Sequence, residues 1–530
     1  MTGELLGDIG EVLTFTDVEV SDNGDWYAVV NTVTNGNTGE INGNQRDPVL
    51  IGSDGIIINR LAAQPGPVFF PALTGLDPAY ELTTIEQIAV NGDDFALFQT
   101  AQFETPFSAS PGSFARGYSR NNELLLLEQV VFDGLQAGAG AVTTFDFVDT
   151  IDLLDNGNIV AAFDVNVPGP NVSGIFEFDP GNPAQAVSVL LYEDQVIPGV
   201  GVIDSFANAD RSFAINGQGD FIASVQLSDA PFISNGRLVR FDSATQSYTV
   251  VAEDRGSPID QPDLQFANIG NGALAINQSG DWLASMTLRS NPPGLSGSVI
   301  VKNGRIEIQG SQQIMLDGET FQLVSSISPQ GAIPYFLTPE GEIVWLARFF
   351  DQSTTFDDMA LVRGNQILLR EGLTTFDNVT FPDVTLTNGG VPVVEIPGGT
   401  FDGVKLVEIG AGLAGSPLGF VLPNDGLDAN SFSMSPNGRF IISEVGIEHP
   451  VNGERLAALV LIDFGEAGRL CADQNADGEV NDSDFFAWVT NFFDQDPVGD
   501  VNQDGAVTDS DFFAWVTFFL QGSDGPTCLG

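Results

Sequence analysis

One short phrase recurs along most of the chain: Asn, Asp or Ser, then a glycine, a polar residue and an apolar run. Its central copies are spaced by 62, 61 and 61 residues. Self-similarity at a nearly fixed period indicates a repeat architecture, in which stacked units share one continuous core. The seven copies centre on Gly24, Asp93 (a looser copy), Gly157, Gly219, Gly280, Gly341 and Gly438.

Each copy predicts two strands closed by a tight turn, in which the glycine supplies a positive φ. A second hairpin-like stretch follows several copies, as in 236–256, 297–310 and 359–372. Four antiparallel strands per ~60 residues are typical of a propeller blade, and radial stacking of blades buries both faces of each sheet. The sequence therefore predicts a mainly β chain, with a β-propeller of about seven four-stranded blades over residues 1–465.

The last interval between copies is 97 residues, so residues 373–430 hold either an insertion or a degenerate eighth blade. An array of immunoglobulin-like sandwiches is the main rival architecture, whereas a β-helix would need a much shorter period. Acids in the turns, such as Asp25, Asp220 and Asp281, are expected to be solvated turn residues rather than ligands. The pattern resembles that of secreted bacterial proteins built from NxxG-containing propeller-like repeats, a resemblance that implies architecture only.

The charge balance narrows the possible functions. With 71 acidic and 18 basic residues the net charge is −53, so nucleic acid and anionic membranes would be repelled rather than bound. The chain has a single histidine, His449, and a Ser-His or Cys-His arrangement could use only that residue. Paired carboxylates for glycoside cleavage stay open, but no pair stands out among so many acids.

The texture of the sequence changes after Phe464. Residues 466–470 read as a linker, and residues 471–530 contain two related stretches, 27 residues apart, each followed by FFAWVT. Each stretch fits a twelve-residue calcium loop, in which oxygen-bearing side chains converge on one ion. The predicted ligands of the two Ca²⁺ ions are Asp473, Asn475, Asp477, Glu479, Asn481 and Asp484 in the first loop, and Asp500, Asn502, Asp504, Ala506, Thr508 and Asp511 in the second.

This small α-helical module resembles the dockerin family in its paired loops, their 27-residue spacing, the single helix after each loop and the Asp at position twelve. In that family two loop–helix calcium motifs pack with quasi-twofold symmetry and present a face to a receptor domain on another polypeptide. The resemblance implies calcium dependence, an attachment role and a protein partner. The flanking cysteines and very aromatic helices depart from cellulosomal dockerins, so a cohesin partner is not implied.

The two expected helices carry more aromatic surface than they can hide against each other. These side chains are either internal or form part of a partner-facing patch. The candidates for that patch are Phe485, Trp488, Phe512 and Trp515.

Cys471 and Cys528 bracket this module. Two thiols that flank one small domain predict a disulfide and an oxidising, extracytoplasmic location, with two unrelated free thiols as the alternative. No apolar run approaches the ~18–20 residues of a membrane span, and the opening residues lack the basic and apolar regions of a signal peptide. We therefore expect a mature form of a protein that is secreted or held at the cell surface.

Together these features favour a secreted, non-enzymatic protein that attaches extracellularly through the calcium-organised module. Its partner would be another protein or a second copy of the chain, and head-to-tail contacts between copies would build a filament, homopolymer or surface layer. Two alternatives stay open. One is a polysaccharide-degrading hydrolase or lyase tethered by the module, and the other is a propeller that binds a glycan or peptide without turnover.

Overall fold

Antiparallel β-strands dominate the computed structural model, and two short helices follow them. The described residues are 11–33, 47–52, 55–59, 80–92, 94–103, 114–120, 123–127, 136–137, 140–141, 144–166, 172–179, 186–206, 213–231, 235–267, 269, 273–290, 296–324, 335–350, 358–371, 375–376, 393–395, 405–408, 420–422, 427–448, 455–464, 474, 482–494, 499, 501 and 507–519. The strands among them form seven sheets of four or more strands and two short ribbons.

Four of the seven sheets are simple meanders, in which each strand pairs with the next along the chain. The first is β1 (Glu11–Val20), β2 (Trp26–Val33), β3 (Asp47–Gly52) and β4 (Gly55–Asn59). The second is β5 (Tyr80–Asn91), β6 (Asp94–Phe103), β7 (Phe114–Arg120) and β8 (Glu123–Leu127). The third is β11 (Thr144–Leu153), β12 (Ile159–Asn166), β13 (Val172–Phe178) and β14 (Ala186–Tyr192). The sixth is β28 (Phe336–Leu337), β29 (Ile343–Phe349), β30 (Asp358–Arg363) and β31 (Gln366–Arg370).

The other three sheets carry additional strands. The fourth is β15 (Val196–Ile197), β16 (Gly201–Phe206), β17 (Phe213–Ile215), β18 (Phe221–Leu227), β19 (Gly236–Asp242) and β20 (Ser247–Glu253). The fifth is β21 (Leu264–Ala267), β22 (Leu274–Ile276), β23 (Trp282–Ser290), β24 (Ser296–Lys302) and β25 (Arg305–Gln309). The seventh is β32 (Thr375–Phe376), β33 (Val393–Glu395), β34 (Lys405–Glu408), β35 (Phe420–Val421), β36 (Leu427–Met434), β37 (Phe440–Glu448) and β38 (Arg455–Asp463). The ribbons are β9 (Gln136–Ala137) with β10 (Gly140–Ala141), and β26 (Gln313–Leu316) with β27 (Glu319–Gln322).

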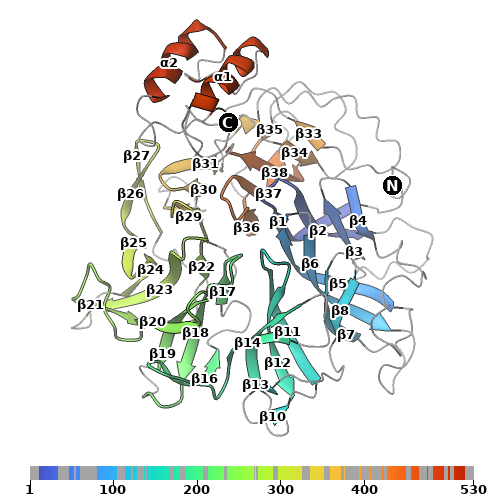
Figure 1. Ribbon diagram of the computed structural model, residues 1–530, viewed down its shortest axis with the longest axis vertical. Coiled ribbons are helices and arrows are strands. Elements are labelled where there is room, and N and C mark those ends of the chain that lie inside the picture. Colours follow the sequence, from blue (N-terminus) through green and yellow to red (C-terminus); the bar gives the residue numbers. More distant parts are fainter. Residues whose placement is uncertain are drawn as a thin grey trace.

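The seven sheets follow one another in chain order around a common centre (Figure 1). Buried apolar side chains fill the interfaces between neighbouring sheets, as where Ile175 of β13 joins Phe221 of β18 in one cluster. Six of the seven residues of β18 are buried, as expected for a sheet that is packed on both faces. This arrangement confirms the predicted β-propeller.

The first and last sheets meet and close the ring. The Ser433 hydroxyl of β36 donates a hydrogen bond to Glu19 of β1. Next to it, the Asn437 amide nitrogen donates to Asp22 Oδ1 at 2.7 Å. Residues more than 400 positions apart in sequence therefore form the last interface of the ring.

Each repeat phrase forms the turn between the innermost strands of one sheet, and its glycine has the predicted positive φ. At Gly280, where φ is +76°, an added Cβ would lie 2.2 Å from an Arg240 guanidinium nitrogen of the preceding sheet. The turn acids are half-buried rather than fully solvated: Asp220 accepts a hydrogen bond from the Ser243 amide at 2.7 Å, and Asp281 accepts one from Asn303 Nδ2 at 2.7 Å.

The described strands within residues 373–430 all belong to the seventh sheet. β34 pairs with β38, β33 pairs with β34, and β35 pairs with β37. They extend an existing sheet instead of forming one of their own, so they favour the insertion over the degenerate eighth blade.

The helices α1 (Asp482–Asp494) and α2 (Asp509–Phe519) lie outside the ring (Figure 1). Their contact is aromatic, with the Trp488 and Trp515 ring centroids 6.2 Å apart. Within the described part of the chain, neither helix is long and apolar enough to cross a membrane.

Candidate functional site

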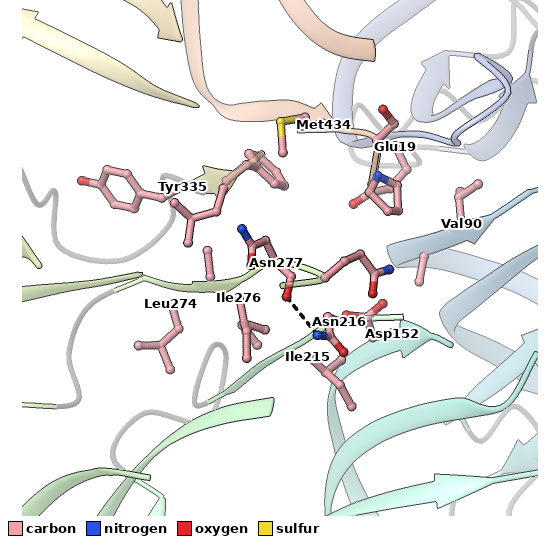
Figure 2. Close-up of a pocket in the computed structure, with 18 of the residues that line it drawn as sticks. Glu19, Val90, Asp152, Ile215, Asn216, Leu274, Ile276, Asn277, Tyr335 and Met434 are labelled. Atoms are coloured by element: carbon pink, nitrogen blue, oxygen red, sulfur yellow. Dashed lines mark hydrogen bonds between the residues drawn. The ribbon is translucent and has the colours of Figure 1, made fainter. Parts of the chain in front are cut away.

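A cavity of about 270 Å³ lies where the innermost strands of all seven sheets converge (Figure 2). The turn residues Asn216, Asn277 and Gln278 line it at the end where the glycine turns lie. Its lining from the strands is Glu19 and Val20 of β1, Ile88, Ala89 and Val90 of β5, Ile151 and Asp152 of β11, Phe213, Ala214 and Ile215 of β17, Leu274, Ala275 and Ile276 of β22, Phe336 and Leu337 of β28, and Met434 of β36.

One position of the repeat supplies the two acids of this cavity. It lies five residues before the repeat glycine, or three before Gly92 in the second repeat, whose turn is shorter. We call the seven residues at this position the channel ring. They are Glu19, Ala89, Asp152, Ala214, Ala275, Phe336 and Ser433. Two of the seven are carboxylic acids, and only the sheet of Ala89 separates them around the ring.

Both acids of the channel ring hold their protons unusually well. Burial is the main cause that raises the pKa of Glu19 well above its ordinary value, and the negative charges of Asp17 and Asp152 add to it, while the Ser433 hydrogen bond opposes it. Burial also raises the pKa of Asp152 to about 7, partly offset by the Leu153 amide, which donates to Asp152 Oδ1 at 2.8 Å. Near neutral pH the pair can therefore hold one protonated and one ionised carboxyl group.

The strands that carry these acids are tied together at bulges. A register irregularity between Phe15 and Asp17 of β1 accompanies the contact of Asp17 Oδ2 with the Ile88 amide of β5, which donates at 3.0 Å. A matching irregularity in β5 accompanies the contact of Gln87 Oε1 with the Ile151 amide of β11, at 3.3 Å. A bulge changes the direction in which a side chain points. The contacts of Asp17 and Gln87 connect β1, β5 and β11 into one frame around Glu19 and Asp152.

Amide side chains form the polar part of the cavity wall. Asn216 Nδ2 donates to the Asn277 carbonyl at 2.9 Å, the contact drawn in Figure 2, and Asn277 Nδ2 donates to the Thr338 carbonyl at 2.8 Å. Gln278 Oε1 is buried and has no hydrogen-bond partner among the described residues. It is therefore an acceptor that a bound hydroxyl group could satisfy.

The rest of the lining decides what the cavity can bind. Apolar side chains make up most of it, and no Lys, Arg or His occurs among the described lining residues. Tyr335 adds a phenol whose pKa burial raises. Such a lining suits an uncharged, hydroxyl-bearing ligand, whereas a phosphate or a uronate would meet carboxyl groups with no cation to balance it.

Sequence reasoning missed both acids of the channel ring. It treated the acids of the repeats as turn residues and compared the copies for what they share. The usable signal was the opposite: an acid at a position where most copies have an alanine or another uncharged residue. Aligning the copies on the glycine and asking which positions differ would have identified Glu19 and Asp152.

Most of the predicted calcium ligands fall outside the described residues. These ligands are Asp473, Asn475, Asp477, Glu479, Asn481, Asp500, Asn502, Asp504 and Ala506. The two cysteines of the predicted disulfide, Cys471 and Cys528, and the single histidine, His449, also lie outside the described residues. Of the others, Asp484 and Asp511 are fully buried in the first turns of α1 and α2. Asp511 Oδ2 accepts a hydrogen bond from the Thr508 amide at 2.7 Å. The described residues contain no cluster of three or more His, Cys, Asp or Glu that could hold a metal ion.

The predicted partner-facing patch needs revision. Trp488 and Trp515 are only 5% and 4% exposed because they pack against each other in the centre of the helical pair, and Phe512 is half-buried beside Trp488. Of the predicted four, Phe485 alone is exposed, at 38%. The most exposed aromatic side chains of the pair are instead Phe486, Phe493 and Phe513.

Comparisons with known proteins find only distant structural likenesses. No protein-family model and no curated protein matches the chain. A protein of unknown function from Dyadobacter fermentans has a TM-score of 0.29 at 10% identity, covering 86% of this chain and 97% of its own. A PL25 ulvan lyase has a TM-score of 0.31 at 10% identity, covering 86% and 95%. A thermostable family-43 glycoside hydrolase has a TM-score of 0.24 at 11% identity, covering 61% and 97%. TM-scores this low establish neither the fold nor the function of this chain.

The function favoured from the sequence, a non-enzymatic attachment or self-assembly protein, needs correction. The argument against an enzyme relied on the lack of a carboxylate pair, and the structure brings Glu19 and Asp152 into one cavity. The matched structures that are named for an activity are polysaccharide lyases and glycoside hydrolases, and at these TM-scores they assign none to this chain.

Proposed function

We propose that this chain is a glycoside hydrolase that cleaves a neutral polysaccharide in the cavity of the channel ring. The observation that carries the proposal is the pair Glu19 and Asp152, two carboxyl groups with raised pKa values that line one cavity. Glycoside cleavage uses two carboxyl groups in different protonation states, one as an acid and the other as a base or nucleophile. A difference of environment between two acids is what assigns these roles.

Glu19 acts as the general acid in this proposal, because its pKa is raised by burial and by two neighbouring carboxylates. It donates its proton to the glycosidic oxygen as the bond from that oxygen to the anomeric carbon breaks. A water molecule adds its hydroxyl to the anomeric carbon, and its proton passes to the carboxylate of Asp152. The Ser433 hydroxyl, which donates to Glu19, orients the acid. Gln278 Oε1 accepts a hydrogen bond from a sugar hydroxyl.

Charge favours a neutral glycan over an acidic one. A lyase acting on a polyuronate must neutralise the uronate carboxylate, and the described lining of the cavity contains no cationic side chain for that task. The net charge of −53 would in addition repel a polyanion over long range. A hydrolase for uncharged sugars meets neither obstacle.

We further propose that the helical pair tethers this enzyme to an extracellular protein partner. The two predicted calcium loops, the dockerin resemblance and the two cysteines that flank the module, Cys471 and Cys528, support a secreted, calcium-organised module. The buried Asp484 and Asp511 agree with it, because each occupies the last ligand position of its loop at the start of a helix. Two Ca²⁺ ions would be bound there.

The test of the hydrolase compares Glu19→Gln and Asp152→Asn with Asp263→Asn, which changes an exposed acid away from the cavity. The substrates are neutral hexasaccharides of glucose, xylose, mannose, galactose and arabinose in α and β linkages, with reducing sugar as the readout. Each variant of the channel ring should lose about 10²–10⁴-fold in kcat, and the control should match the unchanged protein. No cleavage of any hexasaccharide by the unchanged protein would contradict the proposal.

The test of the tether uses the same chain with and without a chelator. Removing calcium should abolish protection of residues 482–519 in hydrogen exchange, because the loop carboxylates then repel one another. Protection in the seven sheets and hydrolysis of a soluble hexasaccharide should not change. Protection of the helices that is indifferent to the chelator would rule out the calcium sites.

A further inference from the structure

We infer that the enzyme is exo-acting: it takes the terminal residue of a glycan chain end-on and releases one sugar at a time. This inference rests on the proposed function, because it concerns the substrate of the same cavity. It is carried by the shape of the site, whose walls come from the innermost strands of all seven sheets.

A wall of strands on every side leaves a polymer no lateral path past Glu19 and Asp152. An endo-acting site needs a groove that is open at both sides, so that chain can extend away from the cleaved bond in two directions. The lining instead passes without interruption from β1 through β17 and β28 to β36, which lies beside β1. Only the end of a chain can enter such a shaft.

The volume sets how much of the chain enters. About 270 Å³ lies just below the ~300–1,000 Å³ of ordinary small-molecule sites. That space suits one sugar ring and does not hold a longer oligosaccharide. The bond that Glu19 and Asp152 reach is then the one that joins the terminal residue to its neighbour.

The polar end of the shaft is the entrance that this geometry implies. Asn216, Asn277 and Gln278 lie in or next to the glycine turns. Phe213, Leu274 and Tyr335 come earlier in the chain and lie farther from those turns. Asn216 and Asn277 use their amides to hold the turns, and Gln278 Oε1 is left to bind a hydroxyl of the sugar at the mouth. The glycan therefore approaches from the face of the ring where the glycine turns lie.

The test follows product size over time with the full chain and hexasaccharides that carry a fluorescent label at the reducing end. Shortening of the labelled chain by one residue at a time supports the inference. Early appearance of labelled di- and trisaccharides overturns it while leaving the hydrolase standing. No product from any hexasaccharide overturns the hydrolase and this inference together, so the two failures are distinguishable.

A variant tests the shaft directly. Ala214→Phe fills the cavity with a side chain that the channel ring already has at Phe336, and Ala244→Phe adds the same bulk at an exposed turn. We expect kcat/KM to fall about tenfold or more for Ala214→Phe and to stay unchanged for Ala244→Phe. A folded Ala214→Phe protein, judged by its melting temperature, that retains full activity would overturn the inference. If that variant does not fold, the product sizes from the unchanged chain still decide.

Discussion

Two regions of this molecule are built from repeats, and they use repetition in opposite ways. In the helical pair the two copies share the run FFAWVT, and the equivalent Trp488 and Trp515 meet face to face at the centre. In the ring the copies share a glycine turn, but the channel ring differs from sheet to sheet. In the helical pair the residues that the copies share pack against each other, whereas in the ring the position at which the copies differ supplies the two acids of the cavity.

The strongest test of this contrast removes one of the paired tryptophans. Trp488→Ala and Trp515→Ala should each destabilise the helical pair by about 3–5 kcal/mol, because a large buried side chain is lost from a small core. Equivalent positions should give equal effects. Hydrogen exchange of residues 482–519 measures the loss, with protection in the sheets unchanged.

The control for this test is Phe486→Ala, since Phe486 is 70% exposed. It should change the stability of the helical pair by no more than about 0.5 kcal/mol. Strongly unequal effects of the two tryptophan variants would contradict an equal role of Trp488 and Trp515 in this core.

The second test concerns a position where the copies of the ring diverge. Burial raises the pKa of Asp152 from its ordinary 3.8 to about 7, so between these values the folded chain holds a proton that the unfolded chain releases. Stability therefore falls as pH rises through this window. Asp152→Asn should leave stability unchanged at pH 4 and raise it by about 2–4 kcal/mol at pH 8.

Chemical denaturation at the two pH values measures this difference, and Asp263→Asn serves as the matched exposed acid. A gain in stability with a loss of activity is expected of a functional residue held in an unfavourable environment. Equal stability of Asp152→Asn and the unchanged chain at pH 8 would show that the acid is ionised at little cost in the fold.

The third test concerns a repeat position at which both the fourth and the fifth sheets carry an asparagine. Asn216 and Asn277 each donate a buried hydrogen bond to the next sheet. Replacement of either by Ala leaves a buried carbonyl without its donor, so each should reduce the free energy of unfolding by about 1–3 kcal/mol. Denaturant titration measures it. Gln218→Ala, in the same turn as Asn216 but exposed, should stay within about 0.5 kcal/mol of the unchanged chain.

The smallest effect is expected for the cations that link consecutive sheets. Arg363 pairs with Glu342 at 2.9 Å, donates to the Gly438 carbonyl at 3.1 Å and lies over the Phe464 ring. Because Glu342 is half exposed, Arg363→Gln should reduce stability by only about 1 kcal/mol, measured by denaturant titration in low salt. Arg305 is an exposed arginine of β25, and Arg305→Gln should have no measurable effect on stability. A similar loss of stability in both variants would show that the contacts of Arg363 with the next sheet do not stabilise the ring.

The propeller could be predicted because its signal is local. A glycine with positive φ and an apolar run on either side specify a hairpin wherever they occur, and their spacing gives the sheet count. The sequence does not decide between an insertion and an eighth blade at residues 373–430. The reason is that strands such as β34 pair with β38, some 50 residues away, and no local pattern indicates such a partner.

The candidate site was missed because its geometry is not local. Glu19 and Asp152 are 133 residues apart and reach one cavity only through the ring. Three of the four predicted patch residues proved to face inward: Trp488 and Trp515 are buried, and Phe512 is half-buried although its neighbour Phe513 is 68% exposed. Composition shows that such residues exist, but the packing of α1 on α2 decides which of them face inward.

The contact between Ser433 and Glu19 has a consequence for biosynthesis. Glu19 and the hydroxyl that donates to it are 414 positions apart, so the ribosome adds Ser433 long after Glu19. At ribosomal speeds of ~5–20 residues per second, about 20 to 80 s separate the two. A nascent chain that ends before Ser433 lacks the sheet that contacts β1 and so cannot complete the wall of the cavity.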